Sequence, residues 1–210
     1  MRHRISVYGL PAPEWIGVGD AENLPFDRDA FDLGYSFGVL HHSPNTEKAV
    51  SELVRVVKPG GELKIMLYNR HCVYAVGQWF KHALLRGKPW KSLAWVLWHH
   101  MESIGTKSYT RRELTRMLSK LPLEYLRIDT QITAADVLSA SAFPPLNWGF
   151  RAAIRLAGSQ YPYHPSQFGT RQDAGGQSQA PGPLQRPDQI LLTGNRFGFF
   201  HCISATKALA

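Results

Sequence analysis

The chain has 210 residues, 44% of them hydrophobic and 19% charged, a composition typical of a folded globular protein and not of a disordered or fibrous one. The sequence shows no apolar stretch long enough to span a membrane, and the Met1 end lacks the apolar run of a secretory signal. The two cysteines, Cys72 and Cys202, form no metal-binding spacing, which favours the reducing cytoplasm over a disulfide scaffold. The net charge of +8 permits an anionic partner but identifies none.

Two strands are expected in the N-terminal part. An apolar run closed by glycine predicts a strand over Trp15–Val18. Apolar residues alternate with other residues over Phe31–Phe37, which predicts a second strand with its apolar side chains on one side.

A helix follows, with a recognisable beginning and end. Ser43 is a suitable N-cap with Pro44 in the first turn, and apolar residues then recur at three- and four-residue spacing. The run Pro59-Gly60-Gly61 ends the helix, and alternation predicts a strand over Glu62–Tyr68. Strand, helix and strand in this order form a βαβ unit, which is typical of a parallel sheet.

Residues 72–101 are predicted to form helices with a break around Gly87-Lys88-Pro89. The span from Leu63 to Met101 has basic residues but no acidic one, and it holds four of the six tryptophans: Trp79, Trp90, Trp95 and Trp98. The apolar face of the first helix is expected to consist of Val73, Val76, Phe80 and Leu84.

The C-terminal half has fewer clear signals. Thr110 and Glu113 have the spacing of a capping box, which predicts a helix through Ser119. Further strands are expected over Leu123–Thr130 and Phe197–Thr206. Residues 171–188 are rich in Gly, Pro, Gln and Ser and are interpreted as a flexible loop within one domain.

Four motifs occur in a fixed order along the first third of the chain: DAENLPF from Asp20, FDL from Phe31, SFGVLHH from Ser36 and ELVRVVKPGG from Glu52. In order and spacing they resemble the central portion of class I S-adenosylmethionine-dependent methyltransferases of the small-molecule, "type 11" kind. The close resemblance covers roughly residues 16–69. It implies an α/β, Rossmann-like sheet, mostly parallel with an antiparallel C-terminal strand, in a single partial domain over residues 1–210.

The resemblance also implies a set of cofactor-binding residues for S-adenosylmethionine. In the family the acidic residue of the DAE motif accepts a hydrogen bond from the adenine amino group, and the next residue offers its backbone N–H. These roles would fall to Asp20 and Ala21, with Glu22 completing the motif. The backbone of Ser36-Phe37-Gly38 would pass beside the methionine part of the cofactor, and His41 would lie near the transferred methyl group.

Two features of the family are missing from residues 1–15: a first strand that leads into a glycine-rich turn, and a second strand that ends in an acidic residue. Such a turn lets backbone amides approach a cofactor closely. Met1 is therefore interpreted as an internal start, and the chain alone is expected to bind S-adenosylmethionine poorly. The family's sheet without its first strands would leave Phe31–Phe37 with an unpaired edge.

No catalytic residue is assigned. His41 and His42 are conceivable general bases, but local packing explains them at least as well. They also suggest a metal site, yet no Cys, Asp or Glu stands near them at ligand spacing, so no metal is expected.

The sequence thus predicts methyl transfer from S-adenosylmethionine to a small or hydrophobic acceptor. Residues 72–101 occupy the place of the family's substrate-facing insert, and three interpretations stay open: a lid over the acceptor, an interfacial helix on an anionic membrane, or an ordinary helix pair packed over the sheet.

Two other functions also stay open. The basic charge and the aromatic residues allow an RNA-modifying methyltransferase, although no nucleic-acid-binding motif is found. A non-catalytic remnant acting as a partner subunit would explain the missing glycine-rich turn. The sequence does not indicate the oligomeric state.

Overall fold

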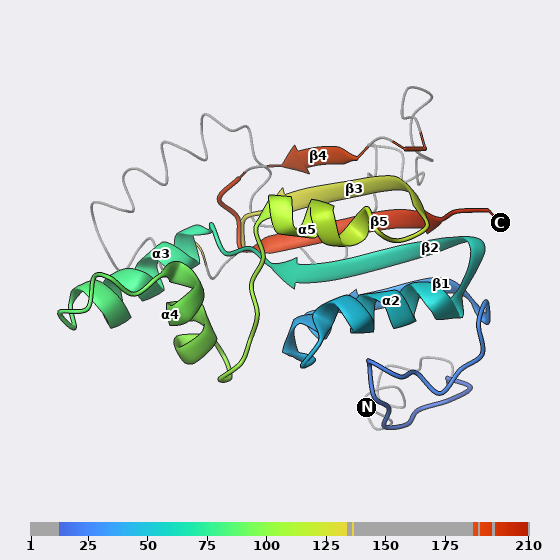
Figure 1. Ribbon diagram of the computed structural model, residues 1–210, viewed down its shortest axis with the longest axis horizontal. Helices are drawn as coiled ribbons and strands as arrows, with labels where there is room; N and C mark the ends of the chain where they lie inside the picture. Colours follow the sequence, from blue (N-terminus) through green and yellow to red (C-terminus); the bar gives the residue numbers. More distant parts are fainter. Residues whose placement is uncertain (1–12, 134–135, 137–186, 189, 195, 210) are drawn as a thin grey trace.

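The computed structural model describes residues 13–133, 136, 187–188, 190–194 and 196–209. These residues form a five-stranded sheet in the order β1-β2-β5-β3-β4 (Figure 1). The strands are β1 (Phe31–Phe37), β2 (Val57–Tyr68), β3 (Leu123–Gln131), β4 (Leu191–Gly194) and β5 (Phe200–Lys207).

The sheet combines parallel and antiparallel strands. β1 is parallel to β2, and β3 is parallel to β4. β5 lies between β2 and β3 and is antiparallel to both. The α/β class and the antiparallel C-terminal strand are therefore confirmed. The sequence did not predict β4, which is only four residues long and pairs with β3 at the edge of the described sheet.

The βαβ unit is confirmed, with α2 (Thr46–Val56) connecting β1 to β2. The predicted N-cap is wrong: the side chain of Asn45, and not that of Ser43, accepts the Lys48 N–H. Ser43 cannot serve as the cap because it ends a short 3₁₀ helix, Leu40–His42, and its hydroxyl donates to the Glu22 carboxylate. β2 also begins earlier than predicted, since Val57 already pairs with Phe31.

Residues 72–101 are helical on both sides of the predicted break. They form α3 (Val73–Trp79), a π-helical turn (Phe80–Leu84) and α4 (Leu93–His100). The predicted apolar face is only partly buried, because Val76 and Leu84 are exposed whereas Ala75 and Ala83 are buried. The π-helical turn, with its wider i→i+5 hydrogen bonding, shifts the phase of the helix and so changes the direction of Leu84, whereas Val76 lies in α3 before this turn.

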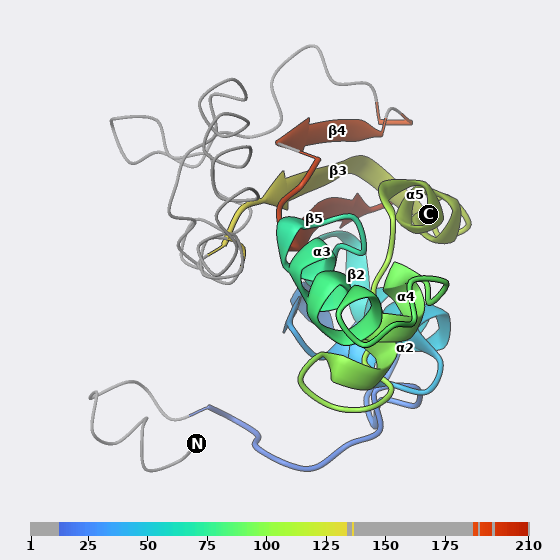
Figure 2. The same ribbon diagram turned by 90° about the vertical axis from the view of Figure 1, so that its left-hand side faces the viewer.

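The last helix, α5 (Arg111–Leu118), begins with the predicted capping box between Thr110 and Glu113. Helices α2 and α5 both cover one face of the sheet (Figure 2). Between them and the strands lies the main core, which includes Val50, Val54, Leu63, Ile65, Leu67, Leu114, Leu118, Ile128 and Ile203. A second apolar cluster joins the carboxyl end of β2 to α3 and α4 through Met66, Tyr68, Cys72, Ala75, Leu97, Met101, Phe199 and Cys202.

One predicted strand is wrong. Residues 15–18 are irregular, and Val18 is fully exposed, because no described strand lies beside them to complete a hydrogen-bonded ladder. Almost all of the predicted loop over residues 171–188 lies outside the described residues. Among the helices of the described part, none has both the length and the apolar character needed to cross a bilayer.

Candidate functional site

The first predicted cofactor segment contacts the chain just after the second one. The Glu22 carboxylate accepts hydrogen bonds from the Ser43 hydroxyl and the Asn45 N–H, both at 2.5 Å. These bonds lower the pKa of Glu22, with the Ser43 bond as the largest cause. Arg55 fixes the same loop by donating to the carbonyl oxygens of Leu24 and Phe26. Glu22 therefore joins the loop over residues 20–26 to the N-terminus of α2 and has a structural role in this arrangement.

Asp20 is an exposed residue of this loop. Its Oδ1 accepts the Glu22 N–H at 2.9 Å, and its carbonyl oxygen accepts the Asn23 N–H. This turn presents the carboxylate at the surface, while the half-buried Ala21 packs against the main core. A carboxylate fixed in this way next to a backbone turn suits the recognition of an amino group.

The carboxyl end of β1 carries the second segment, Ser36 to Gly38. Ser36 is buried, and its hydroxyl has no hydrogen-bond partner in the described part of the chain. Gly38 has a φ of 73°, where a side chain would be strained, and a Cβ there would lie 3.4 Å from the Met66 methyl carbon. The chain therefore turns sharply away from the sheet at the edge where parallel α/β sheets bind their ligands.

His41 lies directly beyond this turn and is completely buried. Neither of its ring nitrogens has a hydrogen-bond partner among the described residues. Its ring lies over that of Tyr68, with the centroids 4.0 Å apart, and Tyr68 in turn stacks on Phe199 at 4.5 Å. Burial lowers the pKa of His41 to about 3, so its imidazole is neutral at physiological pH and is a weak proton acceptor.

Glu102 and His42 complete this region on its solvent side. The Tyr68 hydroxyl donates to Glu102 Oε1 at 2.7 Å, and His42 Nε2 lies 3.5 Å from Glu102 Oε2. Burial and the neighbouring Glu102 raise the pKa of the Tyr68 hydroxyl, which therefore keeps its proton. Glu102 has a φ of 31°, an uncommon backbone conformation for a residue other than glycine.

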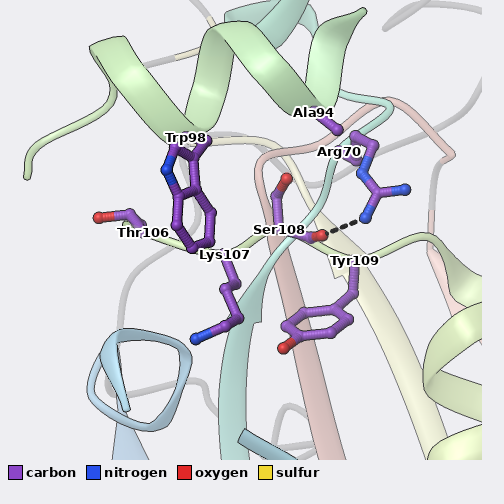
Figure 3. A pocket seen from close by; sticks show the side chains of 7 residues that line it. All are labelled: Arg70, Ala94, Trp98, Thr106, Lys107, Ser108 and Tyr109. Atoms are coloured by element: carbon purple, nitrogen blue, oxygen red, sulfur yellow. Dashed lines mark hydrogen bonds between the residues drawn. The ribbon is translucent and has the colours of Figure 1, made fainter. Parts of the chain in front are cut away.

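A cavity of about 190 Å³ adjoins the turn after β1 (Figure 3). Its walls include the rings of Trp98 and Tyr109 and the cationic side chains of Arg70 and Lys107. The Lys107 ammonium donates to the Ser43 carbonyl oxygen, and the Lys107 N–H donates to that of His41. Arg70 donates to the Ser108 carbonyl oxygen and pairs with Glu113. The cavity thus combines two aromatic walls with two cations whose positions are fixed by hydrogen bonds.

Of the predicted site residues, Glu22 contacts Ser43 and Asn45, which follow the segment Ser36–His41 in the chain. Phe37 points toward β5 and packs edge-on against Phe200, with the ring centroids 5.5 Å apart. Sequence reasoning missed Glu102, Lys107 and Tyr109. They follow the helical segment and carry no motif, so only the contact of Lys107 with Ser43 and of Glu102 with Tyr68 reveals them.

The fold is α/β and Rossmann-like, and sheets of this kind bind their ligands at the carboxyl ends of parallel strands. Residues 7–65 match the family model described as a methyltransferase domain. The matched segment contains the DAE loop, β1 and α2.

Two curated relatives illustrate the similarity. Phthiotriol/phenolphthiotriol dimycocerosates methyltransferase of Mycobacterium leprae is 44% identical over 54 residues, which are 26% of this chain and 20% of the relative. Ubiquinone/menaquinone biosynthesis C-methyltransferase of Bordetella parapertussis is 39% identical over 70 residues, which are 33% of this chain and 26% of the relative. The match thus spans only a minor part of these relatives.

Among solved structures, a methyltransferase of Thermotoga maritima, titled as a possible histamine N-methyltransferase, is similar with a TM-score of 0.45 and 18% identity. The match covers 90% of this chain and 62% of that one. A putative methyltransferase of Haloferax volcanii, in complex with its activator, gives a TM-score of 0.49 and 16% identity, covering 99% and 67% of the two chains.

Proposed function

We propose that this chain carries part of the site for methyl transfer from S-adenosylmethionine to a small or hydrophobic acceptor. The proposal is supported by the methyltransferase-domain match over residues 7–65 and by the hydrogen bonds that join Glu22 to Ser43 and Asn45, just after the segment Ser36–His41.

The observation that carries the proposal is a concentration of buried polar atoms without partners. Among the described residues, five buried side-chain nitrogen or oxygen atoms make no hydrogen bond: Ser36 Oγ, both ring nitrogens of His41, Arg70 Nε and His82 Nδ1. Three of the five belong to Ser36 and His41, inside the predicted cofactor segment. Because leaving such a group unsatisfied costs roughly 1–3 kcal/mol, a polar ligand at this position would explain their retention.

The residues of this chain would act chiefly by binding and orientation. S-adenosylmethionine supplies an electrophilic methyl group when bound. Asp20 would hold the adenine amino group, and the turn at Gly38 would allow the cofactor to approach the backbone closely. The aromatic rings of Tyr68 and Phe199 behind His41 would keep water away from the reacting groups. In-line displacement depends mainly on such positioning, so the proposal needs no dedicated base.

The acceptor side of the proposal rests on the cavity beside Lys107. Its volume of about 190 Å³ is below the roughly 300–1,000 Å³ of a typical ligand pocket, so it would hold one part of an acceptor. Trp98 and Tyr109 favour an apolar or aromatic group, and Lys107 and Arg70 favour an anionic or oxygen-rich one. The names of the two curated relatives refer to dimycocerosates and to quinones, which agrees with a hydrophobic acceptor.

Nuclear magnetic resonance titration with S-adenosylhomocysteine, which also detects weak binding, tests the cofactor site. We expect shifts in the resonances of residues 20–22 and 36–41. Asp20→Asn and Gly38→Val should abolish these shifts, whereas the exposed control Asp27→Asn should retain them. Absence of any shift in the wild-type chain would favour the non-catalytic partner subunit over an enzyme, and equal shifts in Asp20→Asn would refute the assignment of Asp20.

A second function is favoured by the loop between the π-helical turn and α4. Leu85 is 68% exposed and Trp90 is 73% exposed, and Arg86 and Lys88 lie beside them without an acidic neighbour. The helices that flank this loop lie together beyond the carboxyl end of β2 (Figure 1). We propose that the loop touches an anionic membrane surface, where aromatic and basic residues bind together.

Cosedimentation with liposomes tests the membrane contact. We expect the chain to bind vesicles that contain anionic lipid and to bind neutral vesicles less. The double variant Leu85→Ser/Trp90→Ser should lose binding, whereas Ile104→Ser, which removes another strongly exposed apolar residue, should retain it. Equal binding by the loop variant and by the wild type would exclude this loop as the contact.

A further inference from the structure

Three side chains with metal-binding atoms converge at the solvent side of the Tyr68 ring. They are His41 and His42 from the 3₁₀ helix and Glu102 from the segment after α4, and their ligand atoms all lie within 4.8 Å of one another. We propose that His41, His42 and Glu102 form a binding site for a divalent transition-metal ion such as Zn²⁺.

The first argument is the state of His41. Its ring is completely buried, and neither nitrogen has a hydrogen-bond partner among the described residues, although one of them lies within 4.8 Å of the other two ligand atoms. Buried polar groups are nearly always satisfied by protein, water or an ion. The Tyr68 ring packs against the imidazole at a tilt of 41°, with the ring centroids 4.0 Å apart, and so limits how far the ring can move. A metal ion at this point would satisfy it.

The second argument is that His42 and Glu102 each already use one side-chain atom in a hydrogen bond. The Tyr68 hydroxyl donates to Glu102 Oε1, which leaves Oε2 directed at His42. The Thr106 hydroxyl lies 3.3 Å from His42 Nδ1, which leaves Nε2 directed at Glu102. Outer hydrogen bonds of this kind orient histidine and carboxylate ligands in metal sites. His42 and Glu102 are thus each held in place through one side-chain atom, and the second atom of each can bind a metal ion.

The spacing suits a small tetrahedral ion. Two ligands at about 2.1 Å from such an ion are separated by about 3.4 Å. His42 Nε2 and Glu102 Oε2 are 3.5 Å apart, so these two atoms require almost no movement. His41 requires a shift of at most about 1.5 Å, given that all the ligand atoms lie within 4.8 Å of one another.

The donor set indicates which metals fit. Two imidazole nitrogens and one carboxylate oxygen suit Zn²⁺ and other divalent first-row transition metals, whereas Mg²⁺ prefers oxygen ligands alone. Three protein ligands also leave a coordination position for water or for an oxygen of another molecule. His42 and Glu102 are exposed, which gives the ion a path from solvent.

The competing explanation is a plain ion pair between His42 and Glu102. The Lys107 ammonium, which acts electrostatically on His41, is bound to the Ser43 carbonyl oxygen. An ion pair would leave the His41 nitrogens unexplained, and it would bind no metal. The two explanations therefore differ in a direct measurement.

Calorimetric titration of the untagged, chelator-treated full chain with Zn²⁺ tests the proposal, and Co²⁺ absorption spectra report the coordination. We expect one equivalent of Zn²⁺ to bind and Mg²⁺ not to bind. Glu102→Gln and His42→Ala should weaken binding at least tenfold, and Tyr68→Phe by 10- to 100-fold through the lost outer hydrogen bond. The matched controls Glu47→Gln and His71→Ala, both at exposed positions outside the group, should bind as the wild type does.

No saturable Zn²⁺ binding, or binding that persists unchanged in Glu102→Gln and His42→Ala, would overturn the metal site. Because these two side chains are exposed, their variants should keep the circular dichroism spectrum of the wild type. Zn²⁺ should also raise the melting temperature of the wild type and not that of Glu102→Gln, since an ion that binds only the folded state stabilises it. No methyl donor or acceptor takes part, so the result is independent of the proposed methyl transfer.

Discussion

At the scale of single residues, the least expected side chains are buried histidines. His201 on β5 has no exposed surface, and its Nδ1 lies 2.9 Å from the Thr130 hydroxyl while its Nε2 lies 3.2 Å from the Tyr109 carbonyl oxygen. Burial lowers its pKa from the usual 6.5 to about 3. Near pH 6.5, where this histidine takes up a proton in the unfolded chain, its ring in the folded protein is therefore still neutral.

This histidine makes stability depend on pH. Between pH 6.5 and 3 the unfolded chain binds a proton at His201 that the folded chain does not bind, so the free energy of unfolding decreases as the pH falls through this range. The expected slope from this residue is up to about 1.4 kcal/mol per pH unit. Urea denaturation at pH 7.5, 6.5 and 5.5 measures it. His201→Gln should flatten the slope and His71→Gln should not; a slope that His201→Gln leaves unchanged would contradict the assignment.

The sequence could predict site residues only where they belong to contiguous motifs. Asp20, Ser36 and Gly38 follow from such motifs, and the structure brings their segments together through Glu22. The position of Glu102 could not be predicted, because it depends on how far the helices after β2 carry the chain before it returns to Tyr68. The structural role of Glu22 could not be predicted either, because a motif does not show that its carboxylate accepts hydrogen bonds from Ser43 and Asn45.

At the scale of elements, the close packing of α2 on β1 depends on Gly34. An added Cβ there would lie 2.8 Å from Val57 Cγ2 and 3.2 Å from Leu53 side-chain atoms. Strand and helix can approach closely only because this position has no side chain. The approach matters for the site, because the same two elements carry the segment from Ser36 to Asn45 between them.

Gly34→Ala should therefore lower the free energy of unfolding by about 1–3 kcal/mol, as overpacking of a core does. Gly19→Ala is the matched control, since its Cβ would meet only the Pro25 ring at an ordinary 3.6 Å, and a change within about 0.5 kcal/mol is expected. Denaturant unfolding measures both variants. If both variants have the stability of the wild type, β1 and α2 can move apart at little cost in free energy, and the position does not require glycine.

Elements with strong local signals were predicted well. β1 has the predicted bounds, and the capping box places the start of α5 correctly, because alternation and capping act within a few residues. The predicted strand over residues 15–18 and the predicted apolar face of α3 were wrong. A strand needs a neighbour to pair with, and a helix face depends on every turn keeping the same period, and neither condition is visible in local sequence.

At the scale of the whole molecule, the described sheet ends at β1, which pairs with β2 alone among the described residues. The side of β1 that faces away from α2 carries Phe31 and Leu33, which are 39% and 49% exposed. An apolar edge strand presents backbone groups and side chains that another strand can cover. This edge is thus the part of the described surface best suited to contact with a further strand.

We expect the chain to associate through this edge as its concentration rises. Leu33→Lys should reduce association, because a charged side chain on an edge strand opposes the approach of another strand. The variant should keep the stability of the wild type, since Leu33 is half exposed and contributes little to the core. Sedimentation velocity over a range of concentrations measures association, and Leu192→Lys on β4, at the opposite edge of the described sheet and 47% exposed, is the matched control. A wild-type chain that stays monomeric throughout, or a Leu33→Lys variant that associates equally, would show that β1 is not the contact.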